Sequence, residues 1–277
     1  MPEESPYPLL FSPFDLGGKR LRNRIVHLSM TTSLSRDGKV TERHTQYYAN
    51  RARGGAAMIV TEPVAMAPHQ VVPNKVNVRD DSELDGLKRW AAAVEGQDCR
   101  LVGQVQDPGR GRHTAGRTND AVGASALPDD ISWTVPHVLT RDEIRILIDG
   151  FAQGSARLKR CGWSGVEISA GHGHIFHQFM SPWSNEREDE YGGDFENRLR
   201  LVMELIAAIR AEAGRDFILG VKMPGDDGVP GSIGPDLAAQ IAARIAATGA
   251  AGRSFRIRPS QETGGKCPSG TCRSSVR

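Results

Sequence analysis

The sequence lacks an apolar run long enough to cross a membrane. The chain has 277 residues, of which 39% are hydrophobic and 25% charged, and no segment approaches the ~18 apolar residues of a spanning helix. The first ten residues, MPEESPYPLL, also lack the basic start of a secretory signal. These absences predict a globular cytoplasmic protein without a membrane partner.

Cysteine is scarce and net charge is small. The four cysteines, Cys99, Cys161, Cys267 and Cys272, are too few and too scattered for a disulfide scaffold. The formal net charge is +2, and residues 252–277 contain six basic side chains and one acidic one. The positive excess therefore lies in this tail, where a solvated basic run is the plain interpretation. A small-molecule substrate is expected, and a nucleic-acid partner is not.

A GxGxxG motif is also absent after the first expected strand, which counts against a dinucleotide-binding first half. Apolar runs instead alternate with amphipathic segments. Strands are expected at 23–29, 57–61, 101–106, 165–169 and 217–223, and helices at 41–53, 82–95, 140–161, 194–213 and 235–248. Continuous apolar strands between helices indicate a parallel sheet covered on both faces. The repeat of roughly 45 residues suits an α/β barrel with long loops.

The most informative segment is 166–201, VEISAGHGHIFHQFMSPWSNEREDEYGGDFENRLRL. A buried strand leads into a polar loop with three histidines, and an amphipathic helix follows. The loop is far longer than the ~2–6 residues of a plain strand-to-helix connection. Barrels and doubly wound sheets carry their chemistry at the carboxyl ends of strands, so this loop is the first candidate for a functional site.

Four further blocks accompany this segment: LLFSPFDLGGKRLRNRIV (9–26), YYANRARGGAAMIVTEP (47–63), GQVQDPGR (103–110), and ASALP with PHVLTRDEI (124–144). Over roughly residues 8–250 the chain resembles the old yellow enzyme family of FMN-dependent oxidoreductases. It is nearest the branch of 2,4-dienoyl-CoA reductase and trimethylamine dehydrogenase. The resemblance implies a TIM (β/α)8 barrel with FMN at its carboxyl mouth and NAD(P)H as reductant.

The resemblance assigns a flavin-binding role to residues at the ends of the expected strands. Gln104 matches the family glutamine on the flavin pyrimidine, and an amide offers both donors and an acceptor. Lys222 stands where the family usually has an arginine, which keeps the charge without the planar fork. The remaining assigned positions are Ser29, Met30 and Thr31 under the ring and Pro63, whose role is open.

The histidine loop departs from the family pattern, His-Gly-Ala-His-Gly-Tyr. Here Ser169 takes the first anion-binding position, His172 the second, and His174 the position of the proton-donating tyrosine. The resemblance implies that His172 polarises the substrate oxygen for hydride transfer. His174 is a candidate general acid, because an imidazole titrates nearer neutrality than a phenol.

A metal site is the rival interpretation of this loop. His172, His174 and His177 form the spacing H-x-H-x-x-H, and such histidines can bind zinc. A third interpretation gives His177 a structural role while His172 lines a pocket. We expect no metal.

The family pattern breaks after Gly249. The tail AGRSFRIRPSQETGGKCPSGTCRSSVR shows no strand–helix period, so strands six to eight are expected to be missing or scrambled. The expected domains are 1–250, the amino-terminal part of an FMN-binding barrel, and 251–277, a basic tail that a frameshift would explain. An incomplete barrel of about five βα units exposes strand edges, so we expect poor solubility and colourless protein.

The sequence therefore predicts an FMN-dependent oxidoreductase that passes hydride between flavin N5 and a small unsaturated or amine substrate. The alternative is a truncated, non-catalytic remnant of such an enzyme that cannot hold FMN. The substrate, the choice between NADH and NADPH, an additional iron–sulfur or FAD domain, and a homo-oligomeric state stay open.

Overall fold

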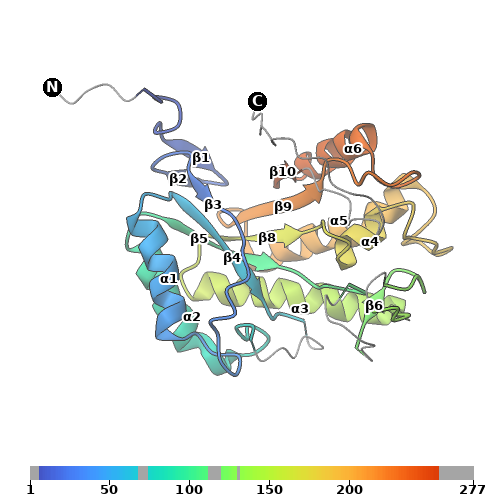
Figure 1. The fold of residues 1–277 in the computed structure, drawn as a ribbon, viewed down its shortest axis with the longest axis horizontal. Coiled ribbons are helices and arrows are strands. Elements are labelled where there is room, and N and C mark those ends of the chain that lie inside the picture. The colour runs from blue at the N-terminus through green and yellow to red at the C-terminus, as the bar shows by residue number, and fades with distance from the viewer. Residues whose placement is uncertain (1–5, 68–73, 112–119, 130–131, 256–277) are drawn as a thin grey trace, which may run out of the picture.

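A six-stranded parallel sheet forms the centre of the computed structural model, which describes residues 6–67, 74–111, 120–129 and 132–255 (Figure 1). The strand order is β10-β9-β8-β5-β4-β3. The strands are β3 (Val26–His27), β4 (Met58–Val64), β5 (Arg100–Val105), β8 (Gly165–Ser169), β9 (Ile218–Pro224) and β10 (Ala251–Phe255). All five pairings are parallel.

Polar side chains cap three of the helices. Thr41 caps α1 (Glu42–Arg53), Thr140 and Glu143 form a capping box at α3 (Arg141–Arg160), and Asp194 caps α5 (Phe195–Ala213). A 3₁₀ turn, η1 (Asp81–Glu83), precedes α2 (Leu84–Glu95), and the side chain of Asp80 caps this turn. Helix α6 (Pro235–Ala246) begins at a proline, whose fixed φ suits a first turn.

A small hairpin covers the amino ends of the inner strands. Strands β1 (Phe14–Leu16) and β2 (Lys19–Leu21) are antiparallel and joined by Gly17 and Gly18, both at positive φ, as a two-residue primed turn requires. A Cβ on Gly17 would lie 3.3 Å from the Cα of Ile218. Glycine therefore lets the hairpin approach the start of β9. Two short strands, β6 (Val122–Gly123) and β7 (His137–Val138), pair elsewhere.

Five βα units follow one another, as the sequence predicts, and a sixth strand continues the sheet. Residues 251–255, which the sequence pattern placed in the tail, pair with β9 in parallel register as β10. The run AGRSF has little apolar content, and its strand character comes from backbone pairing with β9. The rest of the basic tail, 256–277, with Cys267 and Cys272, lies outside the described residues.

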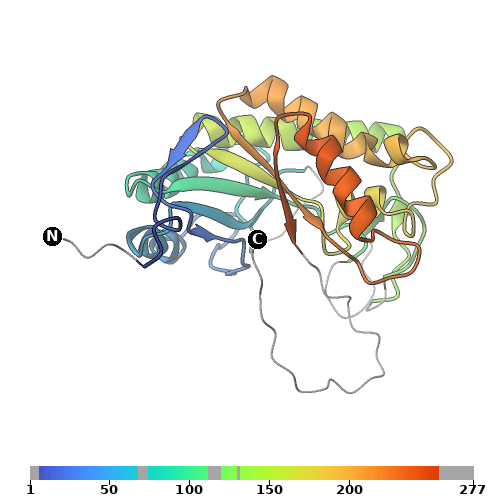
Figure 2. The same cartoon turned by 90° about the horizontal axis from the view of Figure 1, so that it is seen from above.

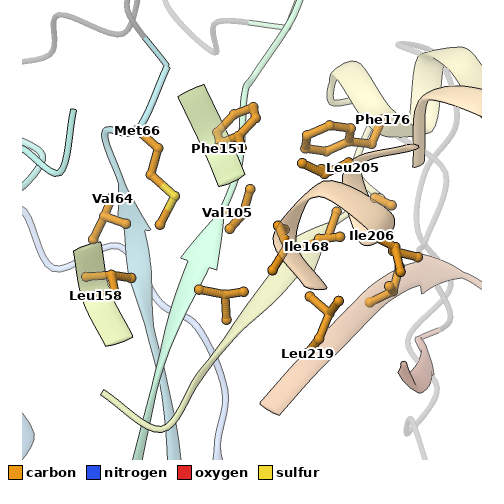
Figure 3. Close-up of a cluster of buried hydrophobic side chains, with 14 of the residues drawn as sticks. Val64, Met66, Val105, Phe151, Leu158, Ile168, Phe176, Leu205, Ile206 and Leu219 are labelled. Atoms are coloured by element: carbon orange, nitrogen blue, oxygen red, sulfur yellow. The ribbon is translucent and has the colours of Figure 1, made fainter. Parts of the chain in front are cut away.

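The sheet has one helix-covered face and one inner face. Helices α3 and α5 lie side by side along the covered face, and the strands fan out strongly from β5 to β10 (Figure 2). Figure 3 shows the core on that side, where Val105 and Ile168 from the sheet meet Phe151 and Leu205 from the helices. A second, smaller cluster, which includes Val102 and Ile218, occupies the inner face.

Among the described ranges, no helix has the length and apolar character of a membrane span.

Candidate functional site

Polar side chains replace the apolar cluster toward the carboxyl ends of the inner strands. Side chains alternate between faces along a strand, so Gln104, two residues after Val102, continues the inner face of β5. Gln104 is in register with Glu167 of β8, and Glu167 with Gly220 of β9. Two residues further along, Ser169 is in register with Lys222. The sequence thus brings Gln104, Ser169 and Lys222 to one face of the sheet.

Gln104 is held at both ends of its amide. Its Oε1 accepts a hydrogen bond from the Ser29 hydroxyl at 2.9 Å, and its Nε2 donates to Oε1 of Glu167 at 3.1 Å. Gln104 and Glu167 are buried, with 4% and 5% of their surfaces exposed. Because an amide nitrogen carries two hydrogens, Nε2 can donate one to Glu167 and another to a ligand. The hydrogen bonds with Ser29 and Glu167 thus identify Nε2 as the donor end of the Gln104 amide and Oε1 as its acceptor end.

Lys222 and Ser169 end neighbouring strands. Ser169 is fully buried and Lys222 is partly exposed. The backbone N–H of Ala170 donates to the carbonyl of Lys222 at 2.7 Å, which extends the pairing of β8 and β9 past Ser169. Lys222 thus brings a cation to the same face as the amide of Gln104.

The segment after β3 lies over this face. Met30 and Thr31 are exposed, as a wall open to a ligand requires. The next residue, Thr32, is anchored by β4: its N–H and its hydroxyl donate to the Glu62 carboxylate at 2.7 and 2.5 Å, respectively. Pro63 is buried at a register shift of β4, opposite Gln104. Proline has no N–H, so the position suits such an irregularity.

Glu62 also contacts His44 of α1, with 2.6 Å between its Oε1 and the imidazole Nε2. Both side chains are buried, and Trp90 packs on the His44 ring with 4.1 Å between centroids. Burial by itself would raise the pKa of Glu62, but the contacts from His44 and Thr32 outweigh it and lower that pKa. The carboxylate is therefore ionised and holds the segment after β3 in place.

His172 and His174 occupy different environments in the loop after β8. His172 is exposed and has a positive φ of 61°, whereas His174 is buried at the start of α4 (Ile175–Met180). Their ring centroids are 5.7 Å apart. The amide nitrogen of Gln106 lies 3.0 to 3.1 Å from the ring nitrogens of His174. The side chain of His172 is therefore open to the surface of the loop, while that of His174 is packed.

Both ring nitrogens of His177 have hydrogen-bond partners. Its Nε2 lies 2.9 Å from Oδ2 of Asp227, and its Nδ1 accepts from the N–H of Gly173 at 2.9 Å. In the described part of the chain, no group of three histidine, cysteine or acidic side chains is arranged to hold a metal ion. Within H-x-H-x-x-H, His177 thus has a structural contact with Asp227 and Gly173.

The sequence interpretation missed four partners of the predicted residues: Glu62, Glu167, Gln106 and Asp227. A signal existed for the two glutamates, because each is a charged residue inside an otherwise apolar strand and a buried charge needs a partner. No signal existed for Asp227, which lies 50 positions from His177.

A separate surface hollow lies at the amino end of α2. It has a volume of about 450 Å³ and is lined by residues 39–40 and 81–89 without Leu87. None of the strand-end residues lines this hollow, so it is distinct from the polar face of the sheet.

The fold and the polar strand ends define an α/β protein with part of a barrel and a polar face at the carboxyl ends of its strands. Residues 9–252 match the model of the NADH:flavin oxidoreductase / NADH oxidase family. The chain belongs to this family, the old yellow enzyme family, as its sequence blocks predict.

Curated relatives are longer than the part that this chain matches. A metal reductase of Desulforamulus reducens is 36% identical over 81% of this chain and 34% of that protein. An N,N-dimethylglycine/sarcosine dehydrogenase of Chromohalobacter salexigens is 34% identical over 88% of this chain and 36% of that protein. An NADPH dehydrogenase of Bacillus licheniformis is 35% identical over 73% of this chain and 59% of that protein. The chain thus spans about a third to three fifths of these relatives.

Solved structures show the same fold. A 2-naphthoyl-CoA reductase complexed with 2-naphthoyl-CoA gives a TM-score of 0.81 at 26% identity and covers 87% of this chain and 39% of that one. A morphinone reductase in complex with tetrahydroNAD gives a TM-score of 0.76 at 24% identity and covers 88% of this chain and 72% of that one. These likenesses confirm the predicted fold class, a TIM barrel of which about five βα units are present.

Proposed function

We propose that this chain carries the flavin-ring site and the substrate loop of an FMN-dependent oxidoreductase that uses NAD(P)H. The observation that carries the proposal is the convergence of Gln104, Ser29 and Lys222 on one face at the carboxyl ends of β3, β5 and β9. Family membership supports the same activity. When bound, FMN would supply a hydride donor and acceptor for a small unsaturated or amine substrate.

The donor set fits the polar edge of a flavin. Gln104 presents an oriented amide to a pyrimidine, and Lys222 places a cation where a reduced, anionic ring needs one. The exposed segment of Met30 and Thr31 offers an adaptable apolar side chain and a hydroxyl against the ring. Pro63, inward beside Gln104, offers the ring an apolar contact.

The substrate contacts follow from the loop after β8. His172, exposed on the loop, donates a hydrogen bond to the substrate oxygen and so stabilises the charge that develops on it. Ser169 supplies a weaker second donor. His174 delivers the proton to the carbon next to the polarised group, with Gln106 holding its ring.

A direct test compares turnover of an unsaturated ketone by the full chain and by His172→Ala, in the presence of FMN and NADPH. We expect the variant to lose about 100-fold in kcat/KM, the usual cost of one charge-stabilising donor. His137→Ala removes an exposed histidine on β7 and serves as the matched control. Equal loss in both variants, or none in His172→Ala, would contradict the assignment.

A chain that binds no flavin would favour the alternative function, a truncated, non-catalytic remnant of such an enzyme that cannot hold FMN. The two functions differ in two readouts, the absorbance of bound flavin and the oxidation of NADPH in the presence of substrate.

A further inference from the structure

Two side chains of the helix that follows, α4, bind the backbone of Gly173, which lies between His172 and His174. Its N–H donates to Nδ1 of His177 at 2.9 Å, and its carbonyl accepts from Nε2 of Gln178 at 2.7 Å. His172 and Gly173 both have positive φ, 61° and 71°. A histidine in this region is uncommon and needs surrounding contacts to hold it there.

The hydrogen bonds fix the tautomer of His177. Nδ1 accepts from Gly173 and so carries no proton, which places the ring proton on Nε2, 2.9 Å from Oδ2 of Asp227. Both groups are buried. A side chain at position 177 must therefore accept a hydrogen bond from Gly173 and donate one to Asp227, which an apolar side chain could not do.

Asp227 is itself fixed by the loop after β9. Its Oδ2 accepts from the hydroxyl of Ser232 at 2.5 Å and from the N–H of Ile233 at 3.3 Å. The Ser232 hydroxyl also lies 2.8 Å from that of Ser181, just after α4. The loop that begins after β9, the strand of Lys222, is thus tied to the loop that carries His172.

We propose that His177 is a positioning residue: through Gly173 it holds His172 in its left-handed conformation, and through Asp227 it sets that turn relative to the end of β9. The catalytic meaning of this contact rests on the proposed function of His172. The contact itself does not, because it involves no cofactor.

Two substitutions separate the hydrogen bond between His177 and Gly173 from the hydrogen bond between His177 and Asp227. In His177→Asn, the amide oxygen can take the place of Nδ1 and accept from Gly173, but the side chain is too short for Asp227. In His177→Gln, the amide nitrogen can reach the place of Nε2 and donate to Asp227, but nothing accepts from Gly173. The two amides have the same chemistry, so each is the control of the other.

The first readout is amide hydrogen exchange at Gly173 in the full chain, with ¹⁵N NMR of the His177 ring. We expect a protonated Nε2 in the wild-type chain, slow exchange in wild type and His177→Asn, and at least about 10-fold faster exchange in His177→Gln, the loss of one hydrogen bond of ~1.4 kcal/mol. A proton on Nδ1, or equal exchange in the two variants, would overturn the proposal.

The second readout is turnover with FMN, NADPH and an unsaturated ketone. We expect His177→Gln to lower kcat about 10-fold with little change in KM for NADPH, and His177→Asn to restore most of kcat. Equal kcat in both variants overturns the positioning role. Absence of turnover in the wild-type chain overturns the proposed function instead, and the exchange measurement distinguishes the two failures.

Discussion

Gln104 and Glu167 are joined across neighbouring strands, with 3.1 Å between the amide Nε2 of the first and the carboxylate Oε1 of the second. The bond orients the amide, and Ser29 holds its oxygen. A buried amide with both ends engaged cannot rotate freely. This pair therefore presents donor and acceptor in a fixed arrangement at the mouth of the partial barrel.

Gln104→Leu should weaken flavin binding about 10-fold, because it removes a directed hydrogen bond to the ring and the two hydrogen bonds that Gln104 makes with Ser29 and Glu167. Lumiflavin, which has no phosphate, isolates the contribution of the ring, and quenching of its fluorescence gives the affinity. Gln46→Leu, on the exposed side of α1, should leave the affinity unchanged. Equal affinity in Gln104→Leu and wild type would exclude Gln104 from the site.

Lys222→Met should lower the midpoint potential of bound flavin by about 30 mV or more, because a nearby cation stabilises the reduced, anionic flavin. For a two-electron couple, this shift corresponds to a loss of ~1.4 kcal/mol of that stabilisation. Lys222→Arg should retain most of the potential. Spectroelectrochemical titration measures both. Lys88→Met, an exposed lysine of α2, is the control, and a shift as large there would count against a local role of Lys222.

Glu62→Gln should destabilise the fold by roughly 3 kcal/mol, because it removes the charge of a buried carboxylate that contacts His44 and accepts hydrogen bonds from Thr32. The pKa of Glu62 is lowered in the fold from 4.5. Its ionisation therefore stabilises the protein above pH 4.5, and this contribution is lost as the pH falls further.

Urea unfolding between pH 7 and pH 3 tests this pH dependence. The free energy of unfolding should fall with acid less steeply in Glu62→Gln than in wild type, by up to ~1.4 kcal/mol per pH unit. Glu188→Gln, an exposed residue of the loop before α5, should follow the wild-type curve. Parallel curves for Glu62→Gln and wild type would show that the pair does not stabilise the fold.

Thr140→Ala should cost about 1 kcal/mol by removing the capping box of α3, in which Thr140 and Glu143 each hold a backbone N–H. In a domain of this size, thermal unfolding should shift down by about 2–4 °C. Thr45→Ala, inside α1, should be neutral or slightly stabilising because alanine is the better helix former. An unchanged midpoint in Thr140→Ala would contradict the role of the cap.

The sequence predicts the elements of this fold well where the signal is local. Thr140 is recognisable as a cap, and the inner-face position of Gln104 follows from strand alternation and the parallel order of the sheet. Strand β10 carries no such signal, because its run AGRSF is hardly apolar and it becomes a strand by pairing with β9.

The partners of the site residues depend on distant parts of the chain and could not be predicted. His177 is one of three similar histidines in the sequence, and only the approach of the loop after β9 distinguishes it by bringing Asp227 to its Nε2. Glu62 likewise anchors the segment after β3 through contacts with His44 and Thr32, which lie in two other parts of the chain.

Titration of the full chain with FMN tests the central claim most directly, with the absorbance of the bound flavin as the signal and Gln104→Leu/Lys222→Met as the comparison. The two side chains share one face of the sheet, so their effects need not add. The chain is expected to be colourless as purified, and we predict that it binds added FMN saturably, one FMN per chain, at least about 10-fold more weakly in the double variant. Absence of saturable binding, or equal affinity in both proteins, would contradict the account.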